Sequence, residues 1–435
     1  MAHPPVATSG VAAPTTPMPA ARAMLWVLLL VYILNFLDRQ IVNILAEPIS
    51  QELGLSDTQI GLMTGLAFAL FYTILGIPIA RYADRPHSNR VTIITVSLAA
   101  WSAMTALCGM AQNFVQLLLA RIGVGVGEAG CTPAAMSLIT DAVPAEKRSS
   151  AIAFYGLGVP IGSLLGLVIG GVLADAFGWR IAFLAVGIPG VLLALLLPFI
   201  LKDPRFAGGI KPSKADSAPA LPFFAAVAEM AKSRTFVLLM GGAAFTAFLA
   251  YGKGVWVVIL FQRSFGLSPG MTGLLLGVIL GLAGVAGTWL GGWVADRYGK
   301  KDRRWIIHGP AIGMLVAAPL LFIAYSASDW RVALALLVVP TVLNSMYYGP
   351  TYGAVQGLVR PEARATASSL MLLAQNLIGL GLGPLLFGLL SDSFRPIAGP
   401  ESVRWVLYGA AWLGVIPALM FWFAGRGMAR DLKSG

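Results

Sequence analysis

The stretch WRIAFLAVGIPGVLLALLLPFIL at residues 179–201 is apolar except for Arg180. A helix needs roughly 20 consecutive, mostly apolar residues to cross the hydrocarbon core of a bilayer. This stretch therefore predicts one membrane-spanning helix. Comparable runs recur along the chain and predict further spans at residues 24–46, 58–82, 90–111, 114–140, 150–176, 235–262, 270–295, 305–326, 331–357, 364–391 and 404–425.

The composition indicates that lipid is the solvent for most of the chain. Hydrophobic residues make up 57% of its 435 residues and charged residues 11%, whereas soluble proteins carry about 25% charged residues. We expect an all-α membrane protein with twelve transmembrane helices. The net charge of +11 arises from short basic clusters between the apolar runs. Such clusters are typical of the loops that fix the orientation of a membrane protein, rather than of a nucleic-acid-binding surface.

The sequence gives no indication of metal or cofactor chemistry. Cys108 and Cys131 both fall in apolar runs, and the chain has no CxxC motif, HExxH motif or histidine cluster. It also has no catalytic or nucleotide-binding constellation. We therefore expect no metal site, no cofactor and no enzymatic activity.

The distribution of basic residues predicts the orientation of the chain. Lys and Arg are retained on the cytoplasmic side of short loops, and placing both termini inside puts most of the 30 basic residues there. The first external loop then carries Glu47, Glu52 and Asp57 and no basic residue. We expect a monomeric, multi-pass protein of the cell (inner) membrane with both termini cytoplasmic.

Two sets of six spans are separated by a stretch rich in Pro, Ser and Lys, a composition typical of surface linkers. The predicted organisation is a disordered cytoplasmic tail (1–22), an N-terminal six-helix bundle (23–202), a cytoplasmic linker (203–233), a C-terminal six-helix bundle (234–426) and a cytoplasmic tail (427–435).

The two halves carry similar signals after matching spans. Asp84-Arg85 follows the second span and Asp296-Arg297 follows the eighth. A Pro-x-Glu-Lys-Arg segment (144–148) follows the fourth span, and a Pro-Glu-x-Arg segment (361–364) follows the tenth. These coincidences imply a parallel internal duplication, in which the halves are related by a pseudo-twofold axis and a binding site lies between them near the midplane.

Several segments resemble a known family. GWVADRYGKK (292–301) is similar to the signature that follows the second and eighth spans in the major facilitator superfamily, and the first-half copy has Ala80 at the glycine position. NFLDRQ (35–40), RIGVGVGEAG (121–130) and GWR (178–180) resemble the spinster-like branch. The resemblance covers nearly the whole chain. It implies the major facilitator fold, alternating access, proton coupling, and substrates such as sphingolipids or lysophospholipids.

The resemblance also implies a cytoplasmic gate formed by Asp84, Arg85, Asp296 and Arg297, which would close by pairing with the opposite half. A helix dipole can strengthen such pairing. The alternative is that these charges serve only as topology anchors.

Five charged residues fall inside predicted spans: Asp38, Arg39, Arg121, Glu128 and Lys253. A charge at the bilayer centre costs on the order of 3 kcal/mol, so such residues usually have a function. We expect Asp38 and Glu128 to be proton acceptors that exchange between pairing with Arg39 or Arg121 and a protonated state. The alternative is a permanent ion pair that only fixes helix packing.

Lys253 is expected either to face the cavity, where it would attract an anionic group, or to snorkel to the outer interface. Other polar and aromatic residues that could line the cavity are Tyr32, Asn35, Phe36, Tyr155, Trp256, Asn344, Tyr347, Tyr348, Gln375 and Asn376. The spacing of Asn344, Tyr347 and Tyr348 predicts one shared helix face. The alternative role for this set is interhelical packing.

Three functions remain open from the sequence. The first is a proton-coupled secondary transporter of a small amphipathic substrate, an anionic lipid or lysolipid, with membrane lipids as its surroundings. The second is an organic-anion/proton symporter, because the Leu-Asp-Arg of the first span also resembles anion-transporting branches of the superfamily. The third is a channel or membrane receptor, for which the sequence has neither a filter-like loop nor a sensor domain.

Overall fold

The computed structural model describes residues 18–85, 87–207, 223–360 and 363–431, and every regular element in these residues is a helix. The predicted all-α class is confirmed. Much of the predicted tails and linker, namely residues 1–17, 208–222 and 432–435, lies outside the described residues, as does Pro361 of the repeated segment. α1 (Met18–Leu53) begins inside the predicted N-terminal tail, and α20 (Val415–Asp431) extends into the predicted C-terminal tail.

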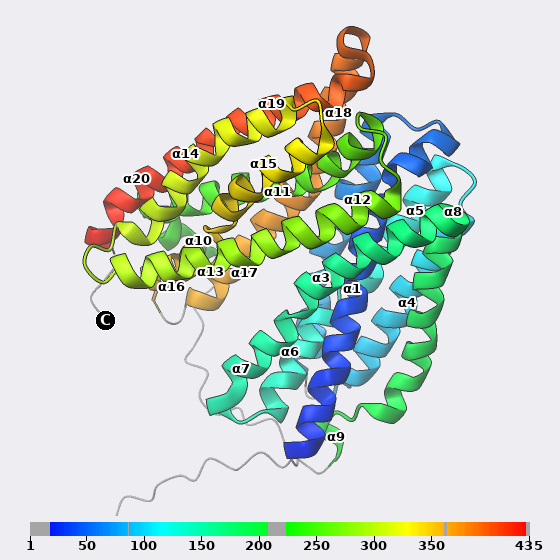
Figure 1. The fold of residues 1–435 in the computed structure, drawn as a ribbon. Helices are drawn as coiled ribbons and strands as arrows, with labels where there is room; N and C mark the ends of the chain where they lie inside the picture. Colours follow the sequence, from blue (N-terminus) through cyan, green and yellow to red (C-terminus); the bar gives the residue numbers. More distant parts are fainter. Residues whose placement is uncertain (1–17, 86, 208–222, 361–362, 432–435) are drawn as a thin grey trace, which may run out of the picture.

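The first half of the chain forms one bundle (Figure 1). After α1, its elements are α2 (Asp57–Gly61), η1 (Leu62–Leu66), α3 (Ala67–Ala83), α4 (Arg90–Met110), α5 (Phe114–Glu128), α6 (Cys131–Ala142), α7 (Ala145–Gly156) and α8 (Gly158–Ile200). Polar residues start several of these helices, because their side chains accept hydrogen bonds from the first free backbone N–H groups. Asn89 does so for α4 and Asn113 for α5.

The second half forms a second bundle, preceded by the short helices α9 (Pro204–Ala207) and α10 (Phe223–Ala231) of the predicted linker. Its elements before α20 are α11 (Arg234–Arg263), α12 (Pro269–Leu275), η2 (Leu276–Leu280), α13 (Gly281–Tyr298), α14 (Trp305–Ser326), α15 (Trp330–Ser345), α16 (Tyr348–Leu358), α17 (Arg364–Ala374), η4 (Gln375–Leu382), α18 (Gly383–Ala398), η5 (Gly399–Glu401) and α19 (Ser402–Leu413).

The number of spans agrees with the sequence. Ten helical stretches of the described residues are long and apolar enough to cross a membrane, and two of them, 146–206 and 366–428, are long enough for two spans each. Gly178 divides the first of these. Its φ of 82° lies in the left-handed region, which glycine adopts without strain and other residues avoid. The boundary predicted between residues 176 and 179 therefore coincides with a break inside α8.

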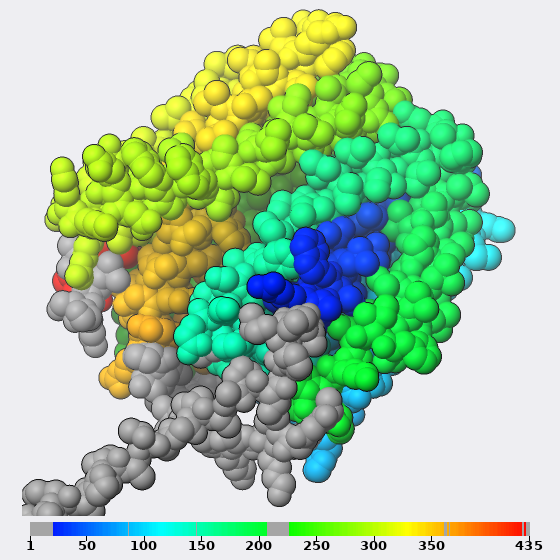
Figure 2. Space-filling view, turned by 60° about the horizontal axis from the view of Figure 1, so that its bottom comes forward, coloured from blue at the N-terminus to red at the C-terminus, as the bar shows by residue number. Residues whose placement is uncertain are grey.

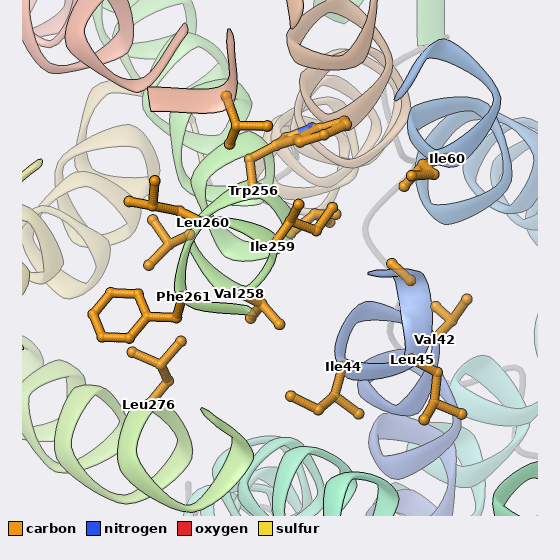
Figure 3. Packing of buried hydrophobic residues seen from close by; sticks show 14 of the residues in the cluster. Val42, Ile44, Leu45, Ile60, Trp256, Val258, Ile259, Leu260, Phe261 and Leu276 are labelled. Atoms are coloured by element: carbon orange, nitrogen blue, oxygen red, sulfur yellow. The ribbon is translucent and has the colours of Figure 1, made fainter. Parts of the chain in front are cut away.

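The hydrophobic core differs between the two ends of the molecule. One cluster contains buried residues of both halves, including Val42, Ile44 and Leu45 of α1 and Trp256, Ile259 and Phe261 of α11 (Figure 3). A second cluster draws its buried residues from the first half, and a third from the second half. The two bundles therefore share a core at one end and have separate cores at the other.

This arrangement gives the molecule a closed end and an open end. At the closed end, α12 packs against α8 and α18 packs against α2. Toward the open end, where α7 begins and α13 and α20 finish, the bundles diverge (Figure 1). Figure 2, in which the bottom of this view comes forward, shows the surface hollowed between α13 and α8.

Gly273 of α12 shows how tightly the closed end is packed. A Cβ atom at this position would lie 2.1 Å from the carbonyl oxygen of Leu167 in α8, so no larger residue fits without separating the two helices. By contrast, a Cβ atom at Gly281, one residue after η2 on the same span, would meet nothing within 4 Å.

We predict that Gly273→Leu destabilises this conformation by about 1–3 kcal/mol, the usual cost of overpacking a tight contact. Gly281→Leu is the matched control, because it adds the same side chain to the same span in open space. Thermal unfolding of the two purified variants measures the difference. Equal unfolding midpoints would show that the α12–α8 contact does not hold the closed end together.

Candidate functional site

Arg39 of α1 and Glu128 at the end of α5 form an ion pair inside the first bundle. Arg39 Nε lies 2.7 Å from Glu128 Oε2, and the Glu128 side chain is 0% exposed. The Arg39 guanidinium also lies over the rings of Phe68 and Tyr72, at 4.8 and 4.6 Å from their centroids. Aromatic faces attract cations. One of the predicted charge pairs is therefore present, between two helices of the first bundle.

The other buried charges have fewer partners. Asp38 and Arg121 are both buried, yet Arg121 makes no ion pair within 4.0 Å in the described part of the chain. Its Nε donates a long hydrogen bond of 3.4 Å to the Met63 carbonyl, and its Nη1 has no hydrogen-bond partner there. Asp38 Oδ1 and both amide atoms of Asn35 also lack partners among the described residues. The cluster thus holds one ion pair and two further ionisable groups with unsatisfied atoms.

A groove of about 670 Å³ lies between the two halves. The first half contributes Gln40 of α1 and residues of α8, and the second half contributes residues of α11, η2, α13, α14 and α15. The lining is mostly aliphatic. Lys253 is its one cationic residue, and no carboxylate belongs to the described lining. A groove of this composition suits a mostly apolar molecule that carries a negative charge.

The structure separates the residues that the sequence grouped as cavity-lining. Lys253, Asn344 and Tyr347 line the groove, so Lys253 does not snorkel away from it. Tyr32 stacks on Tyr155 with ring centroids 4.2 Å apart. Phe36 makes an edge contact with Tyr32, at 5.2 Å between ring centroids.

Two aromatic assignments are corrected. Trp256 is 0% exposed, belongs to the core shared by both halves, and donates a 3.0 Å hydrogen bond from Nε1 to the Pro384 carbonyl. It therefore packs the closed end instead of lining a cavity. Tyr348 is 49% exposed and does not line the groove with Asn344 and Tyr347. The reason is that α15 ends at Ser345 and α16 begins at Tyr348, so the regular spacing of one helix does not hold across that break.

The remaining two residues of the predicted lining lie in η4. Gln375 is buried and its Oε1 accepts a 2.9 Å hydrogen bond from the hydroxyl of Tyr352 in α16. Asn376 is half-buried. Neither residue lines the groove.

Sequence reasoning missed several polar groups of the groove. Gln40, Ser163, Thr246, Thr341 and Ser345 all belong to its lining. Gln40 directly follows Asp38-Arg39, and this position could have identified it. Isolated Ser and Thr residues in apolar spans give no such signal, because they commonly donate to a backbone carbonyl of their own helix. Thr246 does so to Gly242 and Thr341 to Leu337.

The sequence also missed a polar network that joins the halves at the closed end. Arg263 at the end of α11 lies 2.7 Å from Glu47 of α1 and 2.9 Å from Asp57 of α2. Asp392 of α18 accepts hydrogen bonds from the backbone N–H of Thr58 at 2.7 Å and from its hydroxyl at 2.6 Å. Charged hydrogen bonds of this kind are stronger than neutral ones. They add to the apolar contacts that hold this end closed.

The four residues predicted to form a cytoplasmic gate do not belong to this polar network. Asp84 and Arg85 at the end of α3 are exposed, as are Asp296 and Arg297 near the end of α13. None of the four makes an ion pair within 4.0 Å in the described part of the chain. Both pairs lie toward the open end, so a gate there is not closed in this conformation.

Comparison with known proteins agrees with this architecture. The family description "Major Facilitator Superfamily" matches residues 28–384. An "MFS-type efflux pump" of Mycolicibacterium smegmatis is 34% identical over 415 residues, covering 95% of this chain and 94% of that protein. "Protein spinster homolog 1" of Homo sapiens is 28% identical over 401 residues, covering 87% and 75% of the two chains.

A solved structure supports the same assignment. A bacterial homologue of the human lysosomal transporter Spinster, crystallised in an inward-facing and unoccupied conformation, has a TM-score of 0.85 and 32% sequence identity to this chain. The alignment covers 96% of this chain and 99% of that one. This chain therefore belongs to the major facilitator superfamily, in its spinster-like branch, and is a membrane transporter rather than an enzyme.

Proposed function

We propose that the protein is a proton-coupled secondary transporter of an amphipathic anion with a lipid-like tail, such as a lysolipid. The observation that carries this proposal is the groove between the halves, which is mostly aliphatic and has one cation, Lys253, and no carboxylate in its described lining. In this proposal the ammonium of Lys253 attracts the headgroup. The aliphatic side chains along α8 and α13 hold the tail, because burying apolar surface is favourable at about 25 cal/mol per Å².

The open end faces the cytoplasm in this proposal, and the closed end faces outward. The closed end holds Glu47 of α1 and Asp57 of α2, and the ends of α3 and α13 at the other side carry exposed basic residues, as the retention of Lys and Arg inside requires. Transport then needs a second conformation. In it, the outer contacts of Arg263 and Asp392 break, and Asp84 and Asp296 gain partners in the opposite half.

The buried charges support coupling to protons. A buried carboxylate is stable as an ion only when it is paired or hydrogen-bonded, and otherwise it takes up a proton. Glu128 has Arg39 as its partner in this conformation, and a conformational change that separates α1 from the end of α5 would leave it unpaired. Protonation of Glu128 or Asp38 would remove that penalty. A proton would thus accompany the conformational change.

We predict that Asp38→Asn and Glu128→Gln each lower transport at least about tenfold and abolish its dependence on the pH gradient. The reason is that an amide side chain neither binds nor releases a proton at the pH values of the assay. The measurement is uptake of labelled lysolipid into proteoliposomes at several internal and external pH values. Glu146→Gln is the control, since Glu146 is an exposed carboxylate of α7 with no role in the buried cluster. If the Arg39–Glu128 pair only fixes helix packing, the variants will unfold more readily and yet keep the full pH dependence.

Lys253→Gln tests the substrate-binding role. We expect it to raise the apparent KM for an anionic lysolipid by about tenfold or more, because it removes the one cation in the described lining of the groove. Uptake of a zwitterionic lysolipid with the same tail should change less. An unchanged KM for the anionic lysolipid would show that Lys253 does not bind the substrate.

The organic-anion/proton symporter is the second candidate, and Lys253 suits it equally well. The two are separated by competition in the same proteoliposomes, using small carboxylates and a lysolipid at matched concentration. The lipid proposal requires that the lysolipid compete far better, because the aliphatic walls contribute only when a tail is present. Effective competition by the small carboxylates alone would favour the symporter.

Arg263→Gln tests the proposed outer gate. The variant leaves the buried carboxylate of Asp57 and that of Glu47 without their cation, and breaking such a pair is strongly destabilising. We expect the outward-open conformation to gain population. With a cysteine introduced at Ile44, which is buried in the shared core, a membrane-impermeant maleimide added to intact cells should then label it severalfold faster.

Arg331→Gln is the matched control for this experiment. Arg331 lies at the same end, its side chain is 72% exposed, and its ion-pair partner, Asp329, is close in sequence. Equal labelling rates in the two backgrounds would mean that Arg263 does not hold the outer gate closed.

A further inference from the structure

A second hollow lies at the open end of the second bundle, apart from the groove between the halves. Its volume is about 1180 Å³, and it shares no lining residue with the groove. It is lined by α10, the start of α11, the end of α16, the start of α17 and the end of α20. Figure 1 shows these elements gathered at the end of the bundle where α20 finishes.

The hollow is strongly basic. Its lining contains six basic residues and two acidic ones: Lys232, Arg234, Arg360, Arg364, Arg426 and Arg430, with Glu229 and Asp431. Arg360 pairs with Glu229 at 3.2 Å, and Arg430 lies 3.9 Å from Asp431. Asp431 also accepts a 2.5 Å hydrogen bond from the hydroxyl of Thr235. The two acids are therefore already engaged.

Four cations of the hollow have no acidic partner among the described residues, and one of them, Arg364, donates a 3.3 Å hydrogen bond to the Gln356 carbonyl. The side chains of the other three donate no hydrogen bond within the described residues. Lys232, Arg234 and Arg426 make no ion pair within 4.0 Å in the described part of the chain. They come from three different places in the sequence: the loop after α10, the start of α11 and the last turns of α20. Their convergence distinguishes this hollow from a loop such as 300–304, whose basic residues follow one another along the chain.

Apolar side chains from the surrounding helices also line the hollow. Met230, Phe236, Leu238, Leu358 and Phe423 belong to the lining. Phe423 is 47% exposed and lies on a helical stretch that is long and apolar enough to cross a membrane. The hollow therefore combines basic residues at helix ends with an apolar wall that includes the exposed side chain of Phe423.

We propose that this hollow binds a phospholipid of the surrounding leaflet through its anionic phosphate headgroup, as a site separate from the transported substrate. Lys232, Arg234 and Arg426 would contact the phosphate, and the acyl chains would lie against Phe423 and Leu238. Basic pockets between helices at a membrane surface favour such headgroups. A bound lipid would join α10 to α11 and α20, and so hold the end of the linker against the second bundle.

The experiment is a titration of the purified full-length protein in neutral detergent with dioleoyl phosphatidylglycerol, dioleoyl phosphatidylcholine or sn-glycerol 3-phosphate, followed by thermal unfolding. We expect phosphatidylglycerol to raise the unfolding midpoint saturably, with the other two compounds having little effect. The triple variant Lys232→Gln/Arg234→Gln/Arg426→Gln should weaken the apparent affinity for phosphatidylglycerol by at least about tenfold, because each cation near an anionic surface contributes severalfold.

The control is Lys147→Gln/Lys300→Gln/Lys301→Gln, which removes the same charge from exposed positions outside the hollow. It should behave like the unmodified protein. If the triple variant does not fold, the single variant Arg426→Gln is titrated in its place, with a smaller loss expected in the same direction. Equal losses in the hollow variant and the control, or equal effects of the two lipids, would overturn the proposal. Saturable stabilisation by glycerol phosphate alone would identify a site for a soluble phosphate and overturn it as well.

Discussion

The contact between the two bundles at the closed end is the interaction on which the rest of this structure depends. It combines a buried apolar cluster from both halves with the Arg263 pairs to Glu47 and Asp57. Elsewhere each bundle has its own core, and η4 of the second half makes a further contact with α3 of the first. Closure at one end therefore leaves the other end free to diverge, and the groove opens between them.

The same contact explains why both apolar and ionic groups are concentrated there. Apolar packing between helices offers little selectivity inside a membrane, because lipid is as apolar as the side chains. Close backbone approach at Gly273 and the charged hydrogen bonds of Asp392 give this interface a defined register. Charge pairs can also exchange partners at modest cost where water reaches them. An interface built this way can form and separate during a transport cycle.

The two halves divide the chemistry unequally. Asp38, Arg39, Arg121 and Glu128 all lie in the first bundle, and Lys253 with Asn344 and Tyr347 lies in the second. The duplicated fold therefore does not imply duplicated roles. In the proposed mechanism the first half responds to protons and the second half supplies most of the groove, so the interface between them is where the two processes are coupled.

The sequence by itself determined the class of the protein, the number of spans and the buried charges. These features follow from local rules: a span needs a run of apolar residues, and a charge inside such a run is conspicuous wherever the chain folds. Only the tertiary structure decided that Glu128 pairs with Arg39, that Trp256 belongs to the shared core, and that the break between the end of α15 and the start of α16 separates Tyr348 from the groove. The Arg263 network could not be predicted from the sequence either, because Arg263 and its partners are more than 200 positions apart. Such contacts depend on how two bundles meet, and no periodicity within a single helix encodes that geometry.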